Sequence, residues 1–140
     1  MTLKLEDKHI FLNLASVSKE DAIKEAGRHL VNLGCVDEKY IDHMLEREKI
    51  MTTYMGEGIA IPHGVNEAKE NIKESGVVFL QYPNGVDFDG ETAFLVIGIA
   101  GKGDEHLEIL SNIAIKIDVN LISQLKNTNN KQDFIDAFGE

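Results

Sequence analysis

Pro62, His63 and Gly64 are the consecutive residues of this chain best suited to chemistry. Proline fixes its own φ angle, donates no N–H group and favours an extended conformation at the residue before it. Glycine can adopt a positive φ angle and lets another molecule approach the backbone closely. The apolar run Ile59 to Ile61 is typical of a strand, so His63 is expected at a strand end, presented as a nucleophile or a ligand.

Two other residues are candidates for the same chemistry. His106 follows the break at Gly101 to Gly103 and opens an expected helix, while Arg47 lies near the end of another expected helix. In α/β sheets, ligands gather where strands end and helix N-termini point. The planar guanidinium of arginine suits phosphate oxygens. If the expected strands Ile59 to Ile61 and Thr92 to Ala100 are neighbours that run in the same direction, His63 and His106 meet at one edge of the sheet.

Together, His63, His106 and Arg47 indicate phosphorylation of a histidine. A neutral imidazole, with an ordinary pKa of about 6.5, is a competent nucleophile at cellular pH. Phosphoryl transfer depends mainly on positioning and electrostatics because its transition state is loose. The chain is therefore expected to need no cofactor and no metal ion of its own.

Each candidate also has a simpler interpretation, and other functions stay open. His106 alone would be an ordinary first-turn residue, and Arg47 a solvated helix charge. As metal ligands, His63 and His106 lack a third partner at a clear spacing, which makes a poor zinc site. The chain could also be a regulatory binding module whose phosphorylation tunes an interaction. The acidic residues between 87 and 91 lack the spacing of a calcium loop, so a solvated loop is expected.

The elements that would position these residues begin with helices. Ser18 with Asp21 is a weak capping box, Gly34 is a stop signal, and Asp37 is expected to cap a second helix. Further helices are expected from Asp104 to about Ile115, from Asp118 to Leu125 and from Lys131 to Phe138.

Strands are expected between these helices, with turns at Pro83–Gly85 and Asp89–Gly90. The expected strands are Ile59 to Ile61, Val77 to Tyr82 and Thr92 to Ala100, with residues 9–14 as a short strand or docked segment and 66–73 as a loop or short helix. Strands that alternate with helices indicate an α/β fold with a largely parallel or mixed sheet, here as one domain over residues 1–140.

Composition narrows the function classes. The chain has 140 residues and a net charge of −10, which argues against nucleic acid as a partner because phosphate contacts need a surplus of Lys and Arg. The charge fits a basic protein partner or simple solubility. No apolar run is long enough for a membrane span and no signal peptide is expected, so a cytoplasmic location follows. The single Cys35 is expected to be a small buried residue.

The stretch from Glu48 to Gly64 closely resembles the active-site signature of the fructose/mannitol class of IIA components of the bacterial sugar phosphotransferase system (PTS). Its core is Gly-x-x-Ile-Ala-Ile-Pro-His-Gly, ending at Gly64. The likeness continues through residues 67–69, 76–79, 81–86, 95–100 and 105–107, nearly the whole chain. The segments 81–83 and 105–106 look most like the mannitol-specific branch.

This resemblance implies a mixed, mostly parallel five-stranded sheet sandwiched by helices. It implies that Nε2 of His63 accepts a phosphoryl group from the phosphocarrier protein HPr and passes it to a cysteine of a IIB partner during mannitol uptake. His106 and Arg47 would steady the phosphoryl group, and the chain would be a free-standing cytosolic subunit. Nitrogen-regulatory relatives share the Pro-His-Gly core, so a regulatory IIA protein is the alternative. We also expect Ile59, Ile61 and Gly64 to line a small apolar patch for transient partners.

Overall fold

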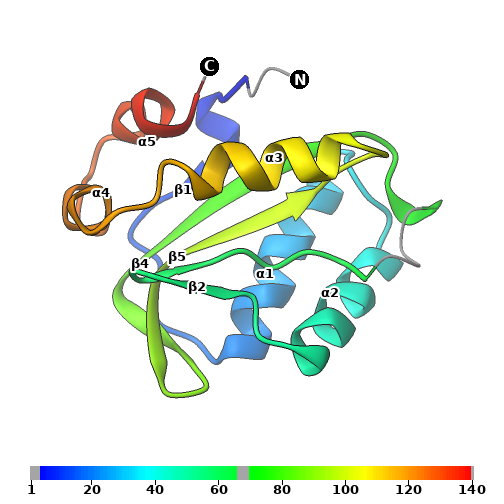
Figure 1. Ribbon diagram of the computed structural model, residues 1–140, viewed down its shortest axis with the longest axis horizontal. Coiled ribbons are helices and arrows are strands. Elements are labelled where there is room, and N and C mark those ends of the chain that lie inside the picture. Colours follow the sequence, from blue (N-terminus) through cyan, green and yellow to red (C-terminus); the bar gives the residue numbers. More distant parts are fainter. Residues whose placement is uncertain (1–3, 66–69, 140) are drawn as a thin grey trace.

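The computed structural model describes residues 4–65 and 70–139, which form a mixed sheet between two layers of helices (Figure 1). The elements are η1 (Asp7–His9), β1 (Ile10–Phe11), α1 (Lys19–Asn32), α2 (Lys39–Ile50), β2 (Tyr54–Gly56), β3 (Ile59–Ala60), β4 (Gly76–Phe88), β5 (Glu91–Ala100), α3 (Glu105–Ala114), α4 (Val119–Leu125) and α5 (Lys131–Phe138).

The order of strands in the sheet is β1-β4-β5-β3-β2. The pairs β1–β4 and β3–β5 are parallel, whereas β4–β5 and β2–β3 are antiparallel. The expected five-stranded mixed sheet is therefore confirmed, although parallel pairing accounts for only half of the neighbouring pairs rather than most of them. The parallel pair β3–β5 matters most for the site, because it brings the ends of these two strands to the same edge.

Alternate residues of β4 point to opposite faces of the sheet, as a period of two requires. Val78 and Leu80 pack in the cluster that contains the buried side chains of α1 and α2. Val77 and Phe79 pack in a second cluster with the buried side chains of α3, α4 and α5. Figure 1 shows the same arrangement, with α1 and α2 below the sheet and the C-terminal helices above it.

The β4–β5 hairpin differs from expectation at one point. The predicted turn at Pro83–Gly85 is wrong, because β4 continues through these residues to Phe88. Gln81 pairs with Leu95 but Val86 pairs with Ala93, so the intervening residues form a bulge, in which Gly85 has a φ of 83°. The second predicted turn is confirmed: Asp89 and Gly90 have φ angles of 56° and 97°, which suits a tight hairpin connection.

The helix boundaries largely follow the predicted caps. Ser18 accepts a hydrogen bond from the N–H of Asp21 at 3.1 Å, and Gly34 has a φ of 81° just beyond α1. Asp37 lies one residue before the N-cap of α2 and accepts from the N–H of Lys39 at 3.0 Å. Asp104 precedes α3 as expected, but its side chain makes no capping hydrogen bond.

The short strand β2 is not predicted by the sequence, and residues 9–14, expected as a short strand or a docked segment, contain the two-residue strand β1. Of the segment expected as a loop or short helix, residues 66–69 lie outside the described part of the chain. Cys35 is buried as predicted, and burial raises the pKa of its thiol. Among the described residues, no helix combines the length and apolar character needed to cross a membrane.

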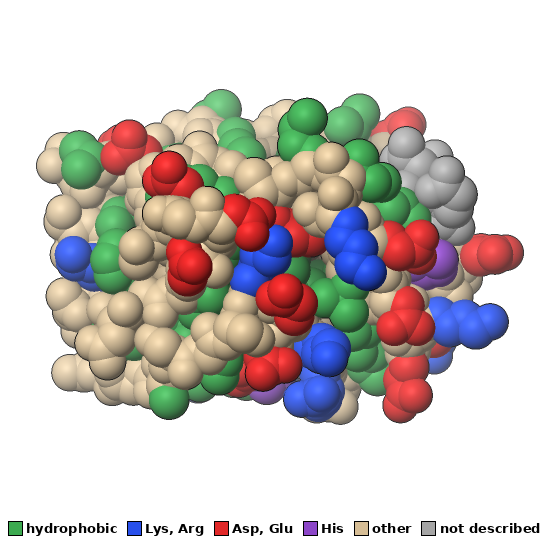
Figure 2. All heavy atoms as spheres, turned by 90° about the horizontal axis from the view of Figure 1, so that it is seen from below, with side chains coloured by type: hydrophobic (Ala, Val, Ile, Leu, Met, Phe, Trp, Pro, Cys, Tyr) green, Lys and Arg blue, Asp and Glu red, His purple; other side chains and the backbone are tan. Residues whose placement is uncertain are grey.

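Acidic and basic side chains are interspersed over the face of the molecule that Figure 2 shows, which is the lower face of Figure 1. The net charge of −10 is therefore not gathered into one acidic patch on that face.

Candidate active site

His63 lies just beyond the end of β3, as the sequence predicts. It forms an isolated parallel bridge with Ile99 of β5, and its neighbour Pro62 accepts a hydrogen bond from the N–H of Ile99 at 2.9 Å. The side chain is largely enclosed, because His63 is only 9% exposed. The histidine is thus fixed to the edge of the sheet rather than carried on a free loop.

The tautomer of His63 follows from its own hydrogen bond. Nδ1 lies 2.8 Å from the carbonyl oxygen of Ile61. A carbonyl oxygen only accepts hydrogen bonds, so Nδ1 must carry the proton. In the neutral ring this leaves the lone pair on Nε2, which is the nitrogen available as a nucleophile.

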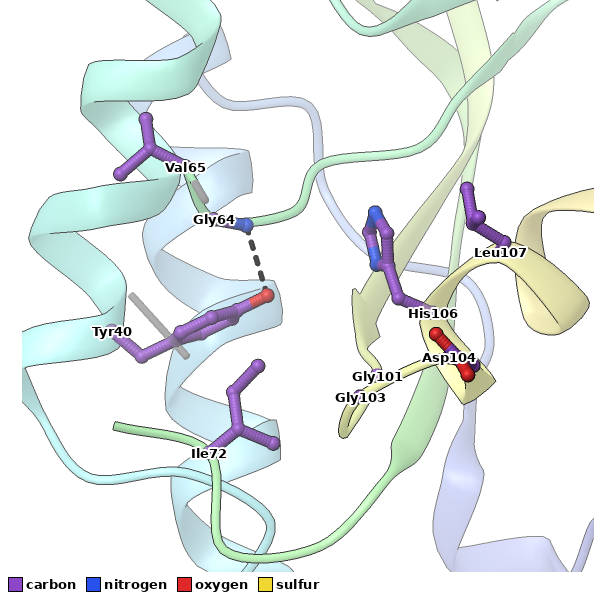
Figure 3. A pocket seen from close by; sticks show the side chains of 9 residues that line it. All are labelled: Tyr40, Gly64, Val65, Ile72, Gly101, Gly103, Asp104, His106 and Leu107. Carbon is purple, nitrogen blue, oxygen red and sulfur yellow. Dashed lines mark hydrogen bonds between the residues drawn. The ribbon is translucent and has the colours of Figure 1, made fainter. Parts of the chain in front are cut away.

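The backbone around His63 is held from two sides. The N–H of Ile61 donates to the carbonyl oxygen of Thr53 at 3.0 Å. The N–H of Gly64 donates to the hydroxyl of Tyr40 at 2.8 Å, a bond drawn in Figure 3. The same hydroxyl donates to the carbonyl oxygen of Ile99, also at 2.8 Å. Tyr40 therefore ties the turn to the end of β5.

His106, the second residue of α3, lies against His63. The ring centroids are 5.2 Å apart and the ring planes are inclined by 52°. The juxtaposition follows from the parallel register of β3 and β5, in which Ala60 pairs with Val96, so that both chains leave the sheet at the same edge. The predicted meeting of the two histidines is confirmed as geometry.

Arg47 lies in the last turn of α2, where its Nη1 donates to the carbonyl oxygen of Met51 at 2.6 Å. Its charge is close enough to lower the pKa of His63. The three residues singled out from the sequence thus come from three different elements and converge on one edge of the sheet.

The pKa of His63 is lowered from its ordinary value, and burial is the main cause. The hydrogen bond to Ile61 opposes this effect, the charges of His106 and Arg47 lower the pKa further, and Glu48 raises it slightly. The net result favours the neutral, nucleophilic ring at cellular pH.

A hollow of about 190 Å³ lies next to His106. Figure 3 shows Tyr40 and Ile72 on one side of it and His106, Leu107 and Asp104 on the other. It is lined further by Gly64, Val65, Gly101 and Gly103. Glycine backbone therefore lines the hollow next to His106, and the hollow has room for a small chemical group.

The alternative sites considered from the sequence gain little support. Among residues 4–65 and 70–139, no three or more His, Cys, Asp or Glu side chains are grouped as metal ligands would be. Asp89 instead pairs with Lys19 at 2.9 Å, and Asp87 accepts from the N–H of Gly90 at 2.8 Å. The acidic segment therefore stabilises the hairpin turn.

The predicted apolar patch is wrong in two of its three residues. Ile59 is fully buried and Ile61 is 6% exposed, because both pack in the cluster that contains the buried side chains of α3. Exposed apolar side chains near the site in sequence include Ile50 and Met51, which follow Arg47, and Leu107, which follows His106.

Residues 4–140 match the family model "Phosphoenolpyruvate-dependent sugar phosphotransferase system, EIIA 2". The chain belongs to this EIIA 2 family. Membership of this family explains why the stretch from Glu48 to Gly64 resembles the family's signature. In the structure, His63 of this stretch lies near His106 and Arg47.

Individual members of the EIIA 2 family are similar over nearly the full length. The mannitol-specific phosphotransferase enzyme IIA component of Staphylococcus aureus (strain Mu50) is 46% identical, with 98% of this chain and 99% of the relative covered. The structure of the complex of enzyme IIA-Mtl and phosphorylated enzyme IIB-Mtl from Escherichia coli has a TM-score of 0.90 and 39% identity, with 97% of each chain covered. The nitrogen regulatory protein IIA-Ntr of Neisseria meningitidis has a TM-score of 0.81 and 26% identity, with 94% and 93% covered.

Some residues that shape this EIIA 2 site were not singled out from the sequence. One of them is Tyr40, because helical periodicity places it on an apolar face but does not reveal what its hydroxyl will bond. Glu48 and Thr53 belong to the segment that precedes β3, and Glu48 is buried despite its charge. Nothing in the sequence around Glu48, a charged residue next to Arg47 near the end of a helix, indicates that its side chain is buried. The remaining histidines, His9, His29 and His43, are partly buried, and the ring of His29 stacks on that of Phe11 with the centroids 3.6 Å apart.

Proposed function

We propose that this chain is a phosphocarrier of the mannitol branch of the PTS, a phosphotransferase component that works through a phosphohistidine. In this proposal, Nε2 of His63 accepts a phosphoryl group from phospho-HPr and delivers it to a cysteine of a IIB partner. The observation that carries it is the bond from Nδ1 of His63 to the carbonyl oxygen of Ile61 at 2.8 Å, which leaves Nε2 as the free nucleophile.

Each transfer exchanges one bond to phosphorus for another. In the first step the Nε2 lone pair of His63 forms a bond to phosphorus as the nitrogen–phosphorus bond in phospho-HPr breaks. In the second, a cysteine thiolate of IIB forms a sulfur–phosphorus bond as the bond to Nε2 breaks. The Nδ1 proton stays in place throughout, held by Ile61, so no proton has to move within the ring.

His106 and Arg47 are proposed to stabilise the charge on the phosphoryl oxygens during both transfers. Preorganised donors of this kind need no rearrangement at the moment of reaction. Their proximity to His63 is visible in the ring contact with His106 and in the effect of both groups on the pKa of His63. When His63 carries the phosphoryl group, the same positive charges would help to hold it.

The choice of the mannitol branch rests on similarity. The mannitol-specific relative is 46% identical, whereas the nitrogen regulatory protein is 26% identical. The Escherichia coli structure pairs a mannitol IIA with phosphorylated IIB, which supports a IIB domain of a sugar permease as the acceptor. We place the chain in the cytoplasm, where HPr would meet it, with neither membrane insertion nor nucleic-acid binding in its function.

Protein partners of a carrier must bind briefly, and interfaces of this kind are small. The exposed Ile50, Met51 and Leu107 adjoin Arg47 and His106 in the chain and would give such a contact its apolar centre. The net charge of −10 would speed encounter with a basic donor.

The proposal is tested by label transfer. The chain is charged with enzyme I, HPr and labelled phosphoenolpyruvate, then offered purified IIB domains specific for mannitol, fructose and other sugars. We expect rapid transfer to the mannitol IIB domain and slow transfer to the others.

The alternative, a regulatory IIA protein of the nitrogen type, is favoured by the shared Pro62-His63-Gly64 core alone. It predicts that the chain is phosphorylated but gives the label to no IIB domain, and that it binds another protein in a phosphorylation-dependent way. That result would overturn the assignment to sugar uptake while leaving His63 as the phosphorylated residue.

A further inference from the structure

Glu48 is a buried carboxylate close enough to the proposed nucleophile to raise the pKa of His63. It lies in the last turn of α2 and is only 5% exposed. Its Oε1 accepts two hydrogen bonds from Thr53, from the N–H at 3.0 Å and from the hydroxyl at 2.5 Å. Burial of a charged group is costly unless hydrogen bonds compensate it, so a carboxylate kept in this position calls for an explanation.

Thr53 connects Glu48 to the turn that carries His63. Its carbonyl oxygen accepts from the N–H of Ile61 at 3.0 Å, and the carbonyl oxygen of Ile61 accepts from Nδ1 of His63 at 2.8 Å. These hydrogen bonds therefore join the end of α2 to the imidazole through the backbones of two residues, Thr53 and Ile61.

We propose that Glu48 is a positioning residue for phosphoryl transfer: through Thr53 and Ile61 it fixes the tautomer and the aim of the His63 ring. This inference rests on the proposed function, because it assigns a role to Glu48 in that reaction. Glu48 does not touch the phosphoryl group; it acts through the peptide of Ile61. Its neighbour Arg47 lies in the same turn of helix, close enough for its charge to lower the pKa of His63, so the end of α2 would supply both a charge-stabilising group and the anchor of the nucleophile.

The role requires an oxygen at the right distance rather than a negative charge. Both donors of Thr53 converge on the single atom Oε1, while Oε2 is buried without a hydrogen-bond partner among the described residues. A glutamine would offer the same acceptor at the same length without the charge. An aspartate would keep the charge but withdraw the acceptor from Thr53.

The test therefore compares Glu48→Gln with Glu48→Asp in the full chain. In E48Q the rate of phosphorylation by HPr should stay within about threefold of wild type, since the acceptor is kept. In E48D it should fall about tenfold or more, because small misplacements of reacting groups are costly. The equivalent changes at Glu46, a more exposed residue of the same helix that pairs with His43, serve as the matched control and should leave the rate unchanged.

A second readout does not depend on transfer. Nitrogen NMR of the His63 ring should report a proton on Nδ1 in wild type and in E48Q, and a mixture of the two tautomers in E48D. A role in stability alone would lower the melting temperature of E48D without changing the tautomer. Glu48→Ala provides a third variant, with the same expectations as E48D.

The outcomes separate the two proposals. If the wild-type chain is not phosphorylated, the proposed function fails, yet the tautomer measurement still tests the connection from Glu48 to His63. If wild type is phosphorylated and E48D is as fast as wild type with an unchanged tautomer, the positioning role of Glu48 is overturned. A rate that falls in E48Q but not in E48D would show that the charge, rather than the acceptor, is what matters, and would overturn it as well.

Discussion

The imidazole rings of His63 and His106 lie 5.2 Å apart between centroids, although the residues belong to different elements and are far apart in the chain. His63 follows β3, and His106 is the second residue of α3, which follows β5. They meet because β3 and β5 are parallel neighbours whose ends share one edge of the sheet. The pair thus depends on strand order, and each ring can affect the chemistry of the other.

Replacement of His106 by Ala should slow phosphoryl transfer while leaving His63 able to accept the group. Loss of one preorganised donor from a charge-stabilising site costs about a hundredfold or more in rate. The measurement is the rate of label transfer to IIB, with His43→Ala as the control, since His43 pairs with Glu46 of the same helix. An H106A rate equal to that of wild type would remove His106 from the mechanism.

Substitution of Arg47 should reveal whether its geometry or its charge matters. Arg47→Lys keeps the charge but loses the planar fork, so a loss of about tenfold is expected, with a larger loss for Arg47→Gln. Arg28→Gln, an exposed arginine on α1, should leave the rate unchanged. Equal rates in R47Q and wild type would contradict the proposed role.

The pKa of His63 should lie below the ordinary histidine value of about 6.5, because burial and the neighbouring positive charges disfavour the protonated ring. Between the folded-state pKa and 6.5, the unfolded chain binds more protons, so the contribution of His63 makes stability fall as the pH falls through this window. An NMR titration of the ring measures the pKa directly. A midpoint above 6.5 would show that the attractive contributions, from Ile61 and Glu48, outweigh burial.

Tyr40→Phe should destabilise the protein by about 1–3 kcal/mol, because it leaves the N–H of Gly64 and the carbonyl oxygen of Ile99 without their shared partner. Urea unfolding measures this change. The rate of phosphorylation should fall as well, since the turn loses one of its two anchors.

Tyr82→Phe is the matched comparison for this change. The hydroxyl of Tyr82 donates to Glu25 at 3.0 Å, on the α1 side of the sheet, so its loss should affect stability but not the rate. If Y40F transferred phosphoryl groups as fast as Y82F, Tyr40 would be a stability residue alone.

Much of the site could be predicted from the sequence because its signals are local. The Pro62-His63-Gly64 turn constrains its own backbone. The glycines before His106 mark the start of a helix, whatever the position of the preceding strand in the sheet. The core strand β5 is apolar enough to be recognised without its neighbours. Ser18 could be recognised as a cap because a cap depends on residues within one turn.

The features that were missed depend on contacts between distant segments. The residues Pro83 to Gly85 look like a turn. They form a bulge instead, because the residues before and after them in β4 both pair with β5. The apolar Ile59 and Ile61 looked available to partners, but their burial depends on α3, which lies far along the chain. Glu48 is different, because its partner Thr53 is close in the chain, but no sequence pattern shows that the segment after α2 turns back toward it.

The most direct test of the central claim asks which atom carries the phosphoryl group. The chain, with its histidine ring nitrogens isotopically labelled, is incubated with enzyme I, HPr and phosphoenolpyruvate, and phosphorus–nitrogen coupling is measured beside a His63→Ala sample. We predict one phosphohistidine, bonded through Nε2 of His63, and none in H63A. Phosphorylation that persists in H63A, a coupling to Nδ1, or a folded wild-type chain that takes up no phosphoryl group would contradict the account.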